Sequence, residues 1–75
     1  MSKYDWSNAP KEVEFIATDK DGVANGFTTE PKSYANCEMW LTEDGDYISL
    51  GVEYLDVFDK DIWEDSLEER PNDLD

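Results

Sequence analysis

The sequence contains no histidine, a single cysteine and only six lysines and arginines among its 75 residues. Without histidine, the chain cannot form a histidine general base, a serine–histidine–aspartate triad or a histidine-ligated zinc site. One cysteine, Cys37, excludes an internal disulfide and a cysteine-cluster metal site. No apolar run approaches the ~18 residues of a membrane span, and the opening residues do not resemble a signal peptide. We therefore expect no enzyme, cofactor or membrane anchor.

The shortage of cations contrasts with 20 aspartates and glutamates, which give a net charge of −14. Residues 38–75 hold fourteen of these acids against only Lys60 and Arg70. This sign argues against direct binding of nucleic acid or of an anionic membrane, because each phosphate contact needs a cation. It also exceeds the net magnitude of about 2 to 8 that solubility requires of a small domain. The charge therefore predicts a partner protein with a basic surface.

A single domain over residues 1–75 is expected, with an irregular lead-in at 1–10 and a frayed tail at 71–75. Two Asp-Gly pairs, Asp21-Gly22 and Asp44-Gly45, lie between β-rich runs and predict two hairpins. The first hairpin places Ile16 opposite Phe27. The predicted strands form an antiparallel meander of about four members: Val13–Asp19, Val23–Thr28, Glu38–Thr42 and Tyr47–Glu53.

The second hairpin shows a clear separation of faces when its register is counted from Asp44-Gly45. Leu41 then lies opposite Ile48 on an apolar face. Trp40 lies on the other face, where it either packs under the lead-in or anchors a partner. Cys37 is expected to be buried. The predicted core comprises Phe15, Ile16, Phe27, Met39, Leu41, Ile48, Leu50, Val52, Phe58 and Ile62.

Beyond Tyr54 the apolar residues follow a period of 3.6, which predicts an acidic amphipathic helix near Lys60–Arg70 that ends before Pro71. The expected fold class is therefore α+β, with the meander followed by this one helix. On the helix, a row of acids at i, i+3, i+4 and i+7 shares one face at a spacing of about 5–6 Å, near that of successive phosphates. The row consists of Asp61, Glu64, Asp65 and Glu68.

The acidic row and its neighbours are the predicted partner-binding surface, with Trp40 as an apolar anchor beside them. The alternative is that the acidic face is only solvated and binds no partner, since most runs of charged residues are solvated surfaces. The further members are Asp56, Asp59, Glu69, Glu43, Asp44 and Asp46.

Two other kinds of acidic site fail on inspection. Asp19 and Asp21 are expected at a turn tip in water, where nothing raises a carboxyl pKa for acid–base catalysis. A calcium loop centred on Gly22 or Gly45 lacks the acid at its first position and the glutamate at its twelfth. We therefore assign no catalytic, cofactor-binding or metal-binding residue.

The stretch Trp63-Glu64-Asp65-Ser66-Leu67-Glu68-Glu69-Arg70-Pro71 resembles a Trp-x-Asp-Ser-Leu-x-x-Arg-Pro ending of small, mostly uncharacterised tailed-bacteriophage proteins. The opening, with Trp6, Ala9-Pro10 and Phe15–Gly22, is similar to the first half of such proteins. The resemblance covers about a third of the chain and carries no catalytic residues over. It implies a phage protein in the host cytoplasm.

The first functional hypothesis is a counter-defence protein that blocks a host defence or nucleic-acid-handling protein, of anti-restriction or anti-CRISPR type, with DNA mimicry as its means. The second is a phage adaptor or structural protein whose charge is incidental, with a homodimer formed through an exposed sheet edge. A basic nucleic-acid-binding partner would favour the first hypothesis, and self-association alone would favour the second.

Overall fold

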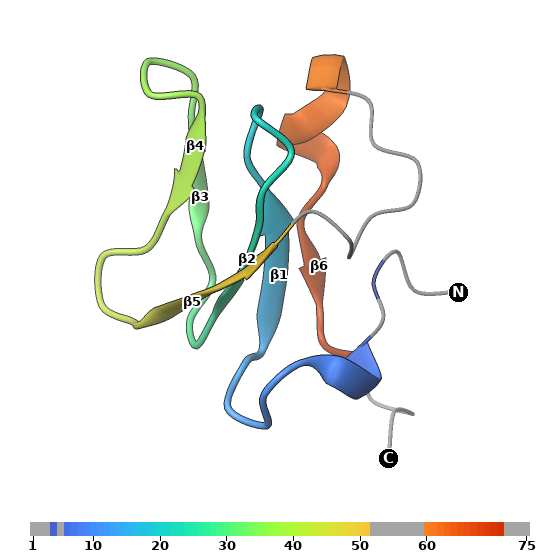
Figure 1. Cartoon of the computed structure of the whole chain (residues 1–75). Helices are drawn as coiled ribbons and strands as arrows, with labels where there is room; N and C mark the ends of the chain where they lie inside the picture. Colours follow the sequence, from blue (N-terminus) through green and yellow to red (C-terminus); the bar gives the residue numbers. More distant parts are fainter. Residues whose placement is uncertain (1–3, 5, 52–59, 72–75) are drawn as a thin grey trace.

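The computed structural model describes residues 4, 6–51 and 60–71, which form two antiparallel sheets and two short 3-10 segments (Figure 1). The larger sheet has the strand order β5-β2-β1-β6, and β3 pairs with β4 in a separate hairpin. The elements in chain order are η1 (Trp6–Asn8), β1 (Phe15–Thr18), β2 (Ala24–Phe27), β3 (Lys32–Tyr34), β4 (Met39–Leu41), β5 (Tyr47–Gly51), η2 (Lys60–Asp65) and β6 (Glu68–Glu69).

The first predicted hairpin exists, but its register differs by one residue from the prediction. Phe15, and not Ile16, lies opposite Phe27. The turn is longer than expected: the Gly22 amide donates to the Asp19 carbonyl at 2.9 Å, and Gly22 alone takes the left-handed conformation, with φ 92°. A two-residue type I′ turn needs positive φ at both central residues, and Asp21 does not adopt it. A three-residue loop ending in glycine forms instead.

The second predicted hairpin is wrong. β4 pairs with β3, and β5 pairs with β2, so the Asp44-Gly45 turn carries the chain from one sheet to the other. This crossing is held by the Thr28 backbone and hydroxyl, which bond to the backbone of Asp46 at 3.1 and 3.0 Å. A side chain at Gly45 would collide with the hydroxyls of Thr28 and Thr29, so the close approach requires glycine.

The faces of β4 are consequently the reverse of the prediction. Trp40 is buried, with 6% of its surface exposed, whereas Met39 and Leu41 are exposed. Burying the indole removes more apolar surface from water than burying either neighbour. Its N–H also finds two carbonyl acceptors inside, those of Thr18 and Trp63.

The predicted C-terminal helix is also wrong, and the α+β class with it: the described residues are mostly β, and their longest helical stretch is the six-residue η2. After Asp65 the chain turns into β6, which pairs with β1. Ser66 explains the change. Its hydroxyl donates to the Trp63 carbonyl at 2.7 Å and accepts the Thr18 amide at 2.8 Å, so the chain leaves the helical path to complete the edge of β1.

Two apolar clusters cover the two faces of the larger sheet. The first joins Tyr4, Trp6, Val13, Ile16 and Ala24, with Ala9, Ile48 and Leu50 against it. The second joins Ala17, Phe27, Trp40 and Trp63, with Phe15 and Leu67 against it. Burial of Ile16 and Phe27 is as predicted, and β1 is covered on both sides. Val52 and Phe58, and the side chain of Ile62, lie outside the described part of the chain.

Candidate protein-binding surface

A buried polar network joins the start of the chain, β1 and the segment after η2. The Tyr4 hydroxyl donates to the Ser66 carbonyl at 2.9 Å and lies 2.8 Å from the Thr18 hydroxyl oxygen. Burial raises the pKa of Tyr4 above its ordinary value of 10.0, so the phenol stays protonated at neutral pH. Within the described structure, every buried side-chain nitrogen and oxygen has a hydrogen-bond partner. The network therefore stabilises the fold and offers no reactive group.

Asp19 is the second buried polar group, although the sequence suggested a solvated turn acid. One carboxylate oxygen accepts the Trp40 backbone amide at 2.7 Å, and the other accepts the Asn25 side-chain amide at 3.3 Å. Desolvation raises the pKa of this carboxyl, and the charge of Asp21 adds to the effect. Asp19 fixes the end of β1 to β4. It thereby holds the β3–β4 hairpin against the larger sheet.

The segment Trp63–Pro71, called the clasp here, contains the residues on which the phage resemblance was based. Arg70 donates through Nε to the Val13 carbonyl and through Nη2 to the Pro10 carbonyl, both at 2.8 Å. Its guanidinium lies 5.0 Å from the centre of the Trp6 ring. Arg70 of the clasp thus contacts Trp6 and Pro10 of the opening stretch, and these contacts join the two ends of the described fold.

The predicted row of acids is not assembled by the structure. Asp56, Asp59 and the side chain of Asp61 lie outside the described residues. Glu64 and Asp65 are exposed on η2. Glu68 and Glu69 are neighbours in β6, so their side chains point to opposite faces. Glu68 accepts the Trp6 indole N–H at 2.7 Å, which places this carboxylate in the fold's own contacts.

Exposed apolar side chains gather instead on the outer face of the β3–β4 hairpin. Tyr34 lies opposite Met39, and each of these residues is 37% exposed; Leu41, two residues further along β4, is 42% exposed. These residues were missed because the sequence register put Trp40 outside. Once the indole is placed inside, strand alternation puts both of its neighbours outside.

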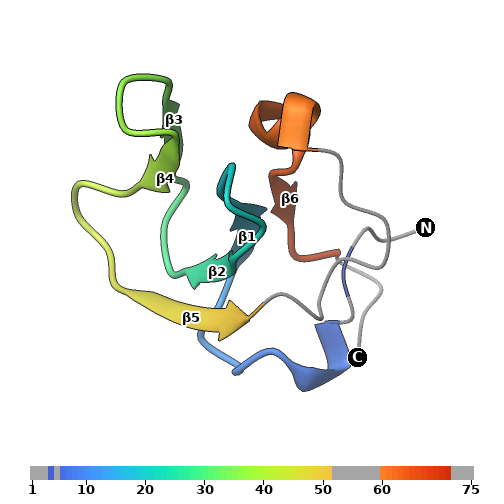
Figure 2. The same ribbon diagram turned by 45° about the horizontal axis from the view of Figure 1, so that its top comes forward.

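The predicted acids Glu43, Asp44 and Asp46 follow directly after β4 and are exposed, as is Glu30 before β3. A groove of about 120 Å³ is lined by residues of both groups, namely Tyr34 and Leu41 together with Glu30, Glu43 and Asp44, and also by Lys32. Figures 1 and 2 show this hairpin and β6 on either side of β1 and β2. The structure therefore brings two of the ten predicted acids, Glu43 and Asp44, beside an apolar face.

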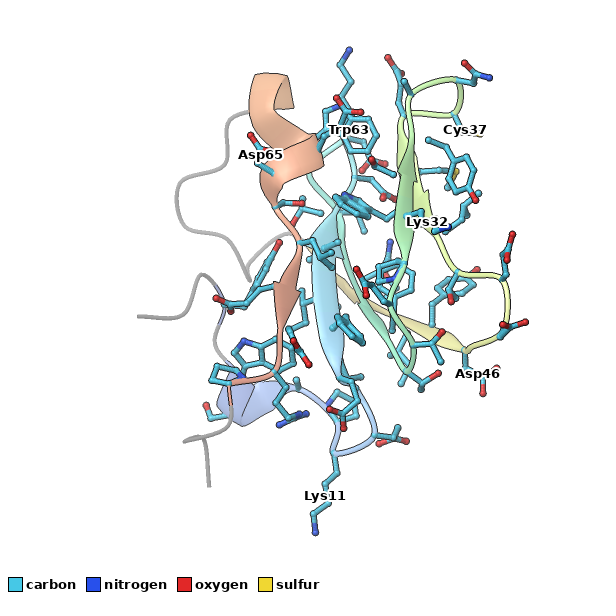
Figure 3. All side chains as sticks on the ribbon, turned by 180° about the vertical axis from the view of Figure 1, so that it is seen from behind. Lys11, Lys32, Cys37, Asp46, Trp63 and Asp65 are labelled. Atoms are coloured by element: carbon cyan, nitrogen blue, oxygen red, sulfur yellow. The ribbon has the colours of Figure 1, made fainter. Side chains whose placement is uncertain are left out.

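Cys37 is exposed in the turn of the hairpin, contrary to the expected burial (Figure 3). It borders a depression of about 380 Å³ together with Asp21, Glu38 and Met39. The nearby Lys20 ammonium lies 3.0 Å from a Glu38 carboxylate oxygen, and the chain has no histidine to act as base. The depression therefore lacks the base that would activate a thiol nucleophile.

No group of three potential ligands suited to a metal ion occurs in the described segments. Their helices are also too short to cross a membrane. Searches of family models, curated proteins and solved structures find no match to the chain.

Proposed function

We propose that the chain is a phage-encoded inhibitor that binds and blocks a host defence or nucleic-acid-handling protein by occupying a basic surface of that protein. The observation that carries the proposal is the net charge of −14, to which many exposed acids of the described residues contribute. Acids are exposed on most connections of the described fold. They include Glu12, Asp21, Glu30, Glu43, Asp44, Asp46 and Glu64.

The few cations do not offset this field, because two of the four whose side chains the structure describes are occupied within the molecule. Lys20 pairs with Glu38, and Arg70 is bonded to backbone carbonyls inside the clasp. Lys11 and Lys32 are exposed. A negative field of this kind steers the protein towards basic surfaces and repels nucleic acid and other anions.

The proposal is supported by the summed negative electrostatic field of the molecule and not by a regularly spaced row of carboxylates. The exposed acids are spread over several connections and η2, so regular spacing along a helix plays no part in the proposal. Host proteins that hold DNA or RNA present basic grooves, because nucleic-acid affinity depends on phosphate contacts. An acidic protein seated in such a groove would exclude the nucleic acid by occupying the same cations.

The test is the affinity for a purified host partner, measured as a function of sodium chloride concentration. The partner is first captured from host lysate on the immobilised chain. We expect binding to weaken steeply with salt, and we expect DNA or RNA to compete with the chain for the partner. Affinity that is independent of salt, or a ternary complex with nucleic acid still bound in its groove, would contradict the proposal.

A second candidate is a phage adaptor or structural protein that functions as a homodimer. The exposed apolar face of the two-stranded β3–β4 sheet favours it, because such faces and edges are sites of association. Sedimentation equilibrium distinguishes the two functions. A stable dimer at physiological salt, with no affinity for a basic partner, would favour the adaptor or structural protein over the inhibitor.

A further inference from the structure

The β3–β4 hairpin combines three features of a protein-docking site, namely an apolar centre, a charged rim and a rigid base. Tyr34, Met39 and Leu41 form the centre. Trp40 anchors the base, since its backbone amide is bonded to Asp19 and its indole N–H lies within reach of the Thr18 and Trp63 carbonyls. A face that is held in place before binding loses less entropy on association.

We propose that this outer face, building on the function proposed above, is where the partner docks, and that its groove takes an arginine or lysine side chain flanked by an apolar residue of the partner. The groove is smaller than the roughly 300–1,000 Å³ of typical small-molecule pockets, at about 120 Å³. It suits one extended side chain. The aliphatic stem lies on Leu41 and the Tyr34 ring, and the cationic head reaches Glu43 and Asp44.

Charge identifies the occupant as a cationic partner and not a second copy of this chain. A symmetric dimer through this face would place Glu30, Glu43 and Asp44 of both copies at the interface and would join two molecules of charge −14. A partner segment that presents cationic and apolar side chains on the same face satisfies both parts of the surface.

Lys32 allows a test in which removal of a charge should strengthen binding instead of weakening it. It lies opposite Leu41 on the same outer face and lines the same groove. No ion pair joins Lys32 to any residue in the described part of the chain. Its ammonium therefore repels a cation that enters the groove. Removing this charge should strengthen binding, whereas removing a rim acid should weaken it.

The first experiment uses short synthetic peptides of equal length, with glycine at every second position so that the other side chains share one face. The arginine–leucine peptide carries both residues at those positions, the arginine–glycine peptide carries arginine alone, and the glutamate–leucine peptide carries glutamate in place of arginine. We expect the arginine–leucine peptide to bind best, with amide chemical-shift changes in isotope-labelled protein centred on residues 30–34 and 39–44. Equal affinity for the arginine–glycine peptide, or shift changes centred on η2 and β6, would overturn the proposal.

Matched variants then test the groove with the same arginine–leucine peptide. Leu41→Ser and Glu43→Gln should each weaken binding about tenfold, the effect of losing one strong interface contact. Lys32→Gln should tighten it severalfold. Glu64→Gln and Glu69→Gln remove acids that are also exposed but lie outside the hairpin, and should change affinity less than twofold. Equal effects of Glu43→Gln and Glu64→Gln would show that only total charge matters, which overturns the hairpin site and leaves the proposed function standing.

A third measurement uses the captured host partner and the single cysteine. A photo-crosslinker attached at Cys37 lies at the hairpin turn, whereas one attached to a Lys11→Cys, Cys37→Ser variant lies at the far end of the molecule (Figure 3). We expect crosslinks to the partner from position 37 and few from position 11. Crosslinks from position 11 and few from position 37 would overturn the proposed face. The absence of crosslinks from both positions to a basic protein that binds the chain would also overturn it.

Discussion

Trp40 holds the two sheets together through its indole ring, its ring nitrogen and its backbone. The ring meets Trp63 edge to face, with the ring centres 6.3 Å apart. We expect Trp40→Ala to lower the free energy of unfolding by about 3–5 kcal/mol, as large-to-small changes of buried aromatic residues do. Urea denaturation measures the change.

Leu41→Ala is the matched control for Trp40, because it truncates the next residue of the same strand on the opposite, exposed face. Its cost should be below about 1 kcal/mol. If Leu41→Ala were the more damaging substitution, the register deduced from the Asp44-Gly45 turn would be right and the observed one wrong.

Asp19 makes stability depend on pH. Its folded-state pKa is raised above 3.8 by burial, so the folded protein keeps a proton that the unfolded chain has already lost. The resulting stabilisation is present below the unfolded pKa and is lost as pH rises through the folded pKa. Asp19→Asn removes this titration, so the stability of the variant relative to wild type should increase with pH across that window.

Urea denaturation at a series of pH values measures this difference for Asp19→Asn. Glu64→Gln is the control, since it also removes one negative charge but from an exposed position. A pH dependence that Asp19→Asn and Glu64→Gln share would assign the effect to general charge repulsion. It would remove the assigned role of the buried carboxyl.

The clasp is an element whose stability depends on one hydroxyl. Ser66 accepts the buried Thr18 amide at 2.8 Å, at the point where β1 has no strand partner from β6. Ser66→Ala leaves that amide unsatisfied and should cost about 1–3 kcal/mol. Ser49→Ala, an exposed serine in β5, should leave the thermal midpoint within a degree or two of wild type. Equal midpoints for the two variants would contradict this account.

The positions of four strands along the chain were predictable from the sequence, but the strands with which they pair were not. Each of the four predicted strands contains a strand of the structure, because alternation and Asp-Gly turns are local signals. Pairing is decided by distant residues. β3 and β6 were missed, since Lys32–Tyr34 and Glu68–Glu69 gain strand geometry only from contacts with β4 and β1. The helix prediction failed for the same reason, at Ser66.

The sequence predicts some of the acidic residues of the candidate site but not the apolar residues that lie beside them. The sequence identifies Glu43, Asp44 and Asp46 as exposed acids, because turn residues beside Gly45 face solvent. It does not show that Tyr34 and Leu41 lie beside them. That juxtaposition follows from the burial of Trp40, which depends on acceptors supplied by β1 and by η2.

The charge of the whole molecule makes salt act oppositely on folding and on binding. Repulsion among the exposed acids opposes the compact state, and added ions screen it. The Debye length falls from about 30 Å at 0.01 M to about 3 Å at 1 M. We therefore expect the thermal midpoint to rise with sodium chloride over the range in which partner affinity falls.

Differential scanning calorimetry in chloride salts measures the midpoint without the exclusion effects of sulfate or phosphate. A Glu64→Gln, Glu69→Gln double variant carries two fewer charges and should show a smaller rise. A midpoint that falls with salt would mean that attractive pairs, such as Lys20–Glu38, outweigh the repulsion.

The position of the clasp also determines when the protein can fold during its synthesis. β1 lies near the start of the chain, yet its edge is completed only by Ser66 and β6. At about 5 to 20 residues per second, a ribosome makes these residues several seconds after β1. During that interval the edge of β1 is open to other nascent chains. The repulsion among the acids, which weakens the finished fold, then keeps those chains apart.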